Sequence, residues 1–299
     1  MLKLEALRVF VTVAELGNIK DASSQLGRTA SAISMTLKQI EIDIGGPLFE
    51  SERKNALTAL GAYVLDTGRE QVRAFDKAIG SIRAFADSRI GKLTLASVPS
   101  VAANVIPPLL QAFIAERPGV EIELIDTDSR NVSSLVEKGI ADFGIAGQPS
   151  DATLVDFTPL FADRFKLICQ RGSRLAKLGQ AVQWSDLENE TFIMNGAIVI
   201  HDIPEFRKLA ERASINVRNV TSLNALVRGG LGVTLLPALA TTDMPHGVVA
   251  LDLDDDRIRR QVGFVTSSNT TLSPAAKSFH DYALKNMRSV LKSLGLGST

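Results

Sequence analysis

The chain has 299 residues, a length that predicts about two domains of ordinary size. Apolar residues make up 45% and charged residues 22%, as in an average soluble globular protein. Lysine and arginine together number 33, as do aspartate and glutamate, so the formal net charge is zero. This balance removes the simplest argument for a nucleic-acid-binding protein, a strongly basic composition, but it does not exclude one, because cations can gather locally.

A single cysteine, Cys169, excludes an intramolecular disulfide and argues against a cysteine-based zinc site. The first 24 residues lack the basic run, apolar core and cleavage site of a signal peptide. No apolar run reaches the length of about 18 residues that a membrane-spanning helix needs. We therefore expect a cytoplasmic protein without a membrane partner.

Three helices are predicted at the start of the chain. Apolar spacing indicates helices over residues 4–16, 19–26 and 30–44, and Gly27 separates the second helix from the third. This is the helix-turn-helix pattern. The segment 48–58, after a Gly-Gly-Pro break, is typical of a short hairpin or loop.

The second helix of such a pair enters the DNA major groove through its N-terminal residues. Hydroxyl groups can bind base edges or phosphates there, and cations can bind phosphates or guanine. The candidates for DNA contact are Arg28, Thr29, Ala30, Ser31, Ser34 and Lys38. The spacing alone also fits a Ser/Thr-rich helix start in an ordinary three-helix domain.

A long helix without proline is predicted from Thr58 to about Arg89. Its apolar residues recur in alternating steps of three and four, which is typical of a seam between two paired helices. The predicted dimerisation residues are Leu65, Val72, Phe75, Ile79 and Ile82, with Gly68 as a gap. The alternative is an amphipathic helix packed on its own domain.

Strands and helices alternate after Gly91. Strands are predicted over 92–98, 120–126 and 141–147, with helices over 101–117 and 132–138 between them, which indicates a parallel sheet. A second alternating block starts with a strand at 165–170. The chain is expected to cross between two lobes near 161–165 and to return near 266–270.

A ligand would bind between such lobes, where strand ends and helix starts converge. The polar candidates for this cleft are Ser97, Ser100, Ser129, Gln148, Asn195, Ser222 and Asn224. Each also fits the role of a helix cap. No catalytic motif or metal-ligand spacing accompanies them, and His201, His246 and His280 are far apart in the sequence. We therefore predict no enzymatic activity, no catalytic residue and no metal or other cofactor.

The ordered motifs resemble those of LysR-type transcriptional regulators. The matching N-terminal stretches are LRVFVTVAELGNIKDASSQL (7–26), SAISMTLKQIEIDIGGPLFE (31–50) and LTALG (57–61). The matching later stretches lie at 106–124, 134–146 and 222–240. The resemblance implies a multidomain α/β protein. It would have a winged helix-turn-helix (1–57), a linker and dimerisation helix (58–90), and a two-lobed effector domain like periplasmic solute-binding proteins (91–299). Lobe I would hold residues 91–163 and 267–299, and lobe II residues 164–266.

Several positions depart from the family pattern: Ser23 replaces the second alanine before the turn, and Asn18-Ile19 replaces a Ser-Phe pair. Ala30 stands where the family has a glutamine, and Ser51 stands where the wing has an arginine. Arg53 and Lys54 lie close enough in the sequence to supply the wing's phosphate contact.

The resemblance also implies partners. These are double-stranded promoter DNA, a small-molecule co-inducer, RNA polymerase, and further copies of the chain in a homodimer or homotetramer. An effector-independent regulator and a solute-binding module without DNA function remain as alternatives.

Overall fold

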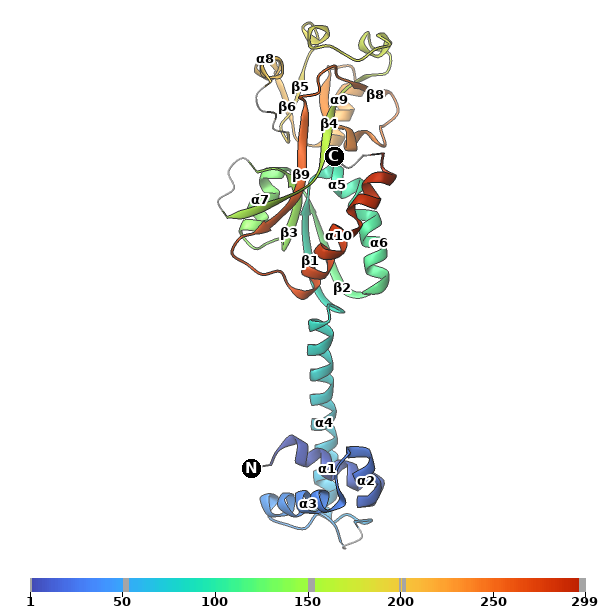
Figure 1. The fold of residues 1–299 in the computed structure, drawn as a ribbon, viewed down its shortest axis with the longest axis vertical. Helices are drawn as coiled ribbons and strands as arrows, with labels where there is room; N and C mark the ends of the chain where they lie inside the picture. Colours follow the sequence, from blue (N-terminus) through green and yellow to red (C-terminus); the bar gives the residue numbers. More distant parts are fainter. Residues whose placement is uncertain (1, 51–53, 150–153, 199, 201–202, 296–299) are drawn as a thin grey trace. The chain divides into compact units, whose positions relative to one another are not determined.

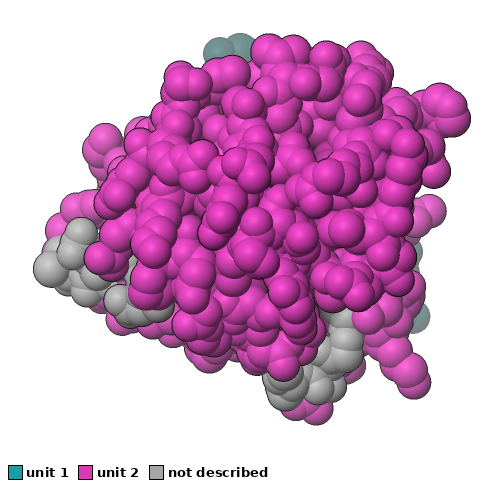
Figure 2. Space-filling view, turned by 90° about the horizontal axis from the view of Figure 1, so that it is seen from above, with its two compact units in different colours: residues 1–84 teal, residues 85–299 magenta. Residues whose placement is uncertain are grey.

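The structure, a computed structural model, describes residues 2–50, 54–149, 154–198, 200 and 203–295. The chain divides into two compact units, residues 1–84 and residues 85–299, which Figure 2 colours separately. Each unit buries an apolar core of its own. No helix in these ranges is both long and apolar enough to cross a membrane.

Three short helices and most of a long one form the N-terminal unit (Figure 1). They are α1 (Leu4–Leu16), α2 (Ile19–Leu26), α3 (Ala30–Ile44) and α4 (Ala59–Ala86). The first three have the predicted bounds because the apolar spacing of each helix stops at a terminating glycine at its C-terminal end. Gly27, for example, ends α2 with a φ of 61°, in the left-handed region that a side chain disfavours.

Large apolar side chains from all three short helices meet in the core of this unit. Phe10, Ile33 and Leu37 are at most 1% exposed. The ring of Phe49 packs edge-on against Phe10, with 5.5 Å between the ring centroids. In the described residues, the predicted hairpin consists of one antiparallel bridge between Phe49 and Leu57.

Seven strands in the described ranges form one sheet in the C-terminal unit. The order is β2-β1-β3-β9-β4-β7, with β8 beside β4. The bounds are β1 (Ile90–Ser97), β2 (Gly119–Asp126), β3 (Phe143–Gly147), β4 (Val155–Gln170), β7 (Thr234–Pro237), β8 (Val248–Asp252) and β9 (Arg259–Ser267). Within this described sheet, only the pairs of β1 with β2 and β3 are parallel, as predicted. β9 runs antiparallel to both β3 and β4, so the sheet is mixed.

Helices cover the sheet in lobe I (Figure 1). They are α5 (Pro99–Asn104), α6 (Ile106–Glu116), α7 (Ser129–Glu137) and α10 (Pro274–Ser293). The single helix predicted over 101–117 is two helices. Pro107 and Pro108 lie in the first turn of α6, where a missing N–H leaves no hydrogen bond unmade.

Lobe II is built around the C-terminal end of β4. It adds β5 (Ile193–Asn195), α8 (Pro204–Arg212), β6 (Ile215–Val217) and α9 (Val220–Arg228), besides the short helices η1 (Leu175–Lys177), η2 (Trp184–Leu187) and η3 (Ala238–Thr241). Cys169 is fully buried on β4, opposite Val249 of β8.

β4 and β9 lie side by side and pass through both lobes. Phe161 and Val262 belong to the core of lobe I, whereas Phe165 and Ile258 belong to the core of lobe II. The returning crossing therefore lies near 258–262, and not at 266–270 as the sequence suggested. Residues 259–262 already belong to β9, which pairs there with β4.

Candidate functional site

The turn between α2 and α3 orders the start of α3. The Arg28 N–H donates to the Ser23 carbonyl oxygen over 3.1 Å. The Thr29 hydroxyl oxygen caps α3 by accepting the Ala32 N–H over 3.2 Å, and it lies 3.1 Å from the Ser31 hydroxyl. Thr29, Ala30 and Ser31 are all exposed, so the start of α3 is open to a partner.

Further along α3, Ser34 is half-buried and Lys38 is exposed. Arg28 is also exposed, with its guanidinium 3.6 Å from the Glu5 carboxylate. An exposed ion pair of this kind adds little stability and can exchange for a phosphate. The first six candidates for DNA contact thus lie on the turn before α3 and on the first nine residues of α3, and all but the half-buried Ser34 are exposed.

Lys54 is held differently. Its ammonium group lies 3.9 Å from a carboxylate oxygen of Glu41 and 4.9 Å from the centroid of the Phe49 ring. Its side chain is only 14% exposed. The same oxygen of Glu41 accepts the Leu48 N–H over 2.9 Å. Lys54 therefore stabilises the segment after α3. Arg53 and Ser51, the other wing positions, lie outside the described residues.

The first half of α4 packs inside its own unit. Val72 is 8% exposed and belongs to the core, and Leu65 packs against that core. Gly68 faces α1, because a Cβ atom there would lie 3.0 Å from Leu7 and 3.1 Å from Val11. Beyond this point Phe75 is 44% and Ile82 64% exposed, and Ile79 is half-buried. The seam thus divides, and only its last three members remain available to a second subunit.

A cleft in the C-terminal unit lies between the two lobes. It holds about 370 Å³ of empty space, its open mouth included. Most of the lining is apolar, and the N-terminal ends of α7 and α9 both reach it. The lining residues are Val98, Pro99, Ser100, Asp128, Ser129, Asn195, Ala197, Ile198, Val220, Leu236, Pro237, Ala240 and Arg260.

Three predicted ligand contacts line this cleft. Ser100 accepts a hydrogen bond of 2.6 Å from Arg260. Ser129 accepts the Gly147 N–H over 3.1 Å. Asn195 is 2% exposed and accepts the Ala197 N–H over 3.0 Å. All three are engaged within the protein, but they bring hydroxyl and amide groups from both lobes to one place.

The other four candidates are not among the described lining residues. Ser97 is fully buried, and its hydroxyl donates to the Ile145 carbonyl oxygen over 3.3 Å, so it ties β1 to β3. Gln148 is exposed. Ser222 donates its N–H to Asn219, which is the actual cap of α9. Asn224 lies further along α9 than the cap, and its side-chain oxygen is buried without a hydrogen-bond partner.

Arg260 and Asp163 form a buried ion pair beside the cleft. The guanidinium of Arg260 lies 2.9 Å from a carboxylate oxygen of Asp163, and the two side chains are 14% and 0% exposed. Burial lowers the pKa of Arg260 from its ordinary value, and Asp163 acts in the opposite direction. The other Asp163 oxygen accepts the Leu239 N–H over 3.3 Å. The pair therefore joins β4, β9 and η3.

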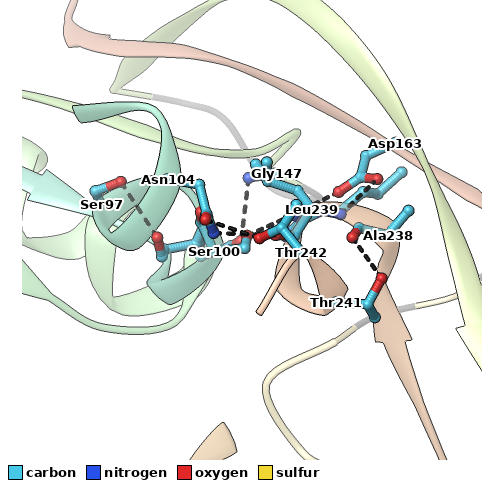
Figure 3. A network of polar contacts seen from close by, with 12 residues as sticks. Ser97, Ser100, Asn104, Gly147, Asp163, Ala238, Leu239, Thr241 and Thr242 are labelled. Carbon is cyan, nitrogen blue, oxygen red and sulfur yellow. Dashed lines mark hydrogen bonds and ion pairs between the residues drawn. The ribbon is translucent and has the colours of Figure 1, made fainter. Parts of the chain in front are cut away.

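A second set of polar contacts ties α5 to η3 and to Thr242 (Figure 3). The Asn104 amide of α5 donates to the Leu239 carbonyl oxygen over 3.0 Å, and the Thr242 hydroxyl donates to Asn104 over 2.8 Å. At the cleft, Arg218 of lobe II lies 3.2 Å from Asp128, the cap of α7 in lobe I. The Arg218–Asp128 ion pair thus spans the two lobes at the cleft.

Two family models match the chain and together cover most of it. Residues 4–62 match "Bacterial regulatory helix-turn-helix protein, lysR family", and residues 86–288 match "LysR substrate binding domain". The chain belongs to the LysR family of DNA-binding transcriptional regulators.

Known LysR relatives match over nearly the whole chain. The regulator YbhD of Escherichia coli K12 is 29% identical over 93% of this chain and 89% of its own length. Full-length CbnR in complex with its target DNA has a TM-score of 0.72 at 19% identity, covering 97% of this chain and all of that one. The oxidised form of OxyR from Corynebacterium glutamicum has a TM-score of 0.70 at 23% identity, covering 98% and 96%. These structures share the LysR fold of this chain.

Sequence reasoning missed two charged residues of the LysR-type cleft, Arg260 and Asp128. Arg260 follows Arg257 and Arg259 in a charged stretch, and nothing in the sequence marks the third arginine as the inward one. Asp128 had a usable signal, because an aspartate directly before a helix is a typical cap.

Lys38 and Lys54 should respond differently to removal of their charge. Lys38→Ala should weaken DNA binding and flatten its salt dependence by about one unit of slope for each phosphate that the chain no longer neutralises. Lys54→Ala should leave the slope unchanged and lower the unfolding temperature, because Lys54 is tied to Glu41. Fluorescence anisotropy over a range of salt concentrations measures both slopes. An unchanged slope for Lys38→Ala would contradict the assignment.

Proposed function

We propose that a small organic effector binds between the two lobes and alters how this regulator binds promoter DNA. The cleft supports this proposal because residues of both lobes line it. A ligand that binds one arrangement of the lobes more tightly would shift the population towards that arrangement. Apolar walls with a few hydroxyl and amide groups suit a small molecule of mixed character. No metal or other cofactor enters this proposal.

The DNA-bound form would be a homodimer or homotetramer, with Phe75, Ile79 and Ile82 contacting the α4 of a second copy. The spacing of the exposed Phe75 and Ile82 and the half-buried Ile79, at steps of four and three, supports pairing of this half of α4. The protein would act in the cytoplasm, without enzymatic activity, with RNA polymerase as a further partner. Ser100, Ser129 and Asn195 are the candidates to contact the effector.

The effector proposal can be tested by filling the cleft. A thermal-shift screen of small organic acids, amino acids and sugars should reveal a compound that raises the unfolding temperature by about 5–10 °C at 100 times its Kd. Ala240→Leu, which places a larger side chain at the cleft, should abolish that shift. Ala225→Leu, on the exposed side of α9, is the matched control and should retain it.

Two results would count against the effector proposal. If no compound stabilises the protein or changes its DNA binding, the chain is an effector-independent regulator. If Ala240→Leu keeps the full shift, the ligand binds elsewhere.

A further inference from the structure

The outward face of α3 carries two exposed apolar side chains. At about 100° per residue, Ser31, Met35, Lys38 and Ile42 share one side of the helix, opposite the buried residues Ile33, Leu37 and Ile40. Met35 is 73% and Ile42 is 72% exposed. Neither side chain belongs to the core of the unit. The side of α3 that is turned away from the core is therefore partly apolar.

The place of Met35 along α3 matters for a DNA-binding helix. At about 1.5 Å per residue, Met35 lies roughly 7.5 Å along the axis from Ala30, and Ile42 lies roughly 18 Å from it. The first turns of a recognition helix are the part that reaches base edges. Ser31 one turn before Met35 and Lys38 one turn after it supply a hydroxyl and a cation on the same side. Met35 thus stands between two groups suited to DNA.

An unbranched thioether side chain has no hydrogen-bond donor and only a weak acceptor. The C5-methyl group of thymine is the apolar group that the major groove presents. We propose that Met35 reads DNA by packing against a thymine methyl group in each half-site. This proposal deepens the DNA-binding function of the family by assigning a base preference to a residue of this chain, and it is independent of any effector.

The test removes the methyl group from the DNA and the side chain from the protein. A preferred site is first selected from a random duplex library with the full-length chain. Each thymine of that site is then replaced by deoxyuridine, which lacks only the methyl group, at symmetric positions in both half-sites. Dissociation constants are measured by fluorescence anisotropy for the unmodified chain, Met35→Ala and Ile42→Ala.

One symmetric replacement should weaken binding by the unmodified chain about 15-fold, from about fourfold for each of the two methyl groups removed. Met35→Ala should bind the thymine site more weakly by a similar factor and should not distinguish thymine from deoxyuridine at that position. Ile42→Ala, equally exposed and on the same side but further along α3, should keep the discrimination. The salt slope of Met35→Ala should be unchanged, because no charge is removed.

Several results would overturn the proposal. One is a selected site in which deoxyuridine, at every position tested, changes the dissociation constants of the unmodified chain and of Met35→Ala by the same factor. Another is loss of the discrimination in Ile42→Ala as well. A third is a change in subunit association of Met35→Ala by light scattering, which would make this face an interface between copies of the chain. A selection that enriches no site would also overturn it.

Discussion

Gly61→Ala should disrupt the DNA-binding unit and abolish specific DNA binding. A Cβ atom on Gly61 would collide with the carbonyl oxygen of Leu48. The surroundings cannot give way easily, because the Thr58 hydroxyl donates to the Pro47 carbonyl oxygen over 2.8 Å and accepts the Gly61 N–H over 2.9 Å. We expect a loss of about 3 kcal/mol, at the upper end for an overpacked site.

Amide hydrogen exchange of α1 to α3 should show the loss of stability directly. Fluorescence anisotropy with promoter DNA should show the loss of binding. Gly80→Ala is the matched control, because Gly80 lies in the same helix and a Cβ atom there meets nothing within 4 Å. That change should stabilise the helix by about 0.5–1 kcal/mol. Full DNA binding and native exchange protection in Gly61→Ala would show that the Leu48 contact is not decisive.

Asp163→Ala should strongly destabilise the C-terminal unit. It leaves the buried guanidinium of Arg260 without its counter-charge and the Leu239 N–H without its acceptor. Breaking one partner of a buried ion pair costs about 3–5 kcal/mol. The single tryptophan, Trp184, lies in this unit, so urea unfolding followed by its fluorescence reports on the unit alone.

Two companion variants make the ion-pair result specific. Arg164 follows Asp163 in the sequence and forms an exposed ion pair with Asp256. Arg164→Ala breaks that pair and should change the unfolding midpoint little. In the double variant Asp163→Ala/Arg260→Ala, the loss of unfolding free energy should be smaller than the sum of the losses in the two single variants, because the second change removes the uncompensated charge. Additive losses would mean that the two side chains act independently.

Periodic helices were the most predictable part of this fold. The bounds of α3 follow from Ile33, Leu37 and Ile40 together with Gly45, because one signal gives the buried face and the other ends the helix. The start of β4 was not predictable in the same way. Pro159 lies within that strand, and a proline argues against a regular strand; it is accommodated at a register shift between Pro159 and Phe161.

The candidate sites show a similar division. The start of α3 could be predicted because a helix-turn-helix is a local pattern, with Gly27 and Thr29 next to the residues that they position. The cleft depends on contacts between distant segments, such as the hydrogen bond from Arg260 to Ser100. Helical spacing grouped Val72 with Ile82, but it could not tell that Val72 is buried in the core of its own unit while Ile82 is exposed.

The burial of Cys169 bears on how this regulator responds to oxidants. Burial raises the pKa of its thiol, and only the thiolate reacts readily with peroxides. A second cysteine to form a disulfide with it is missing from the sequence. Although OxyR has been solved in an oxidised form, the one sulfhydryl of this chain is buried, and its thiolate form is disfavoured there. Sulfur oxidation would therefore require lobe II to open first, which makes the thiol a marker of unfolding.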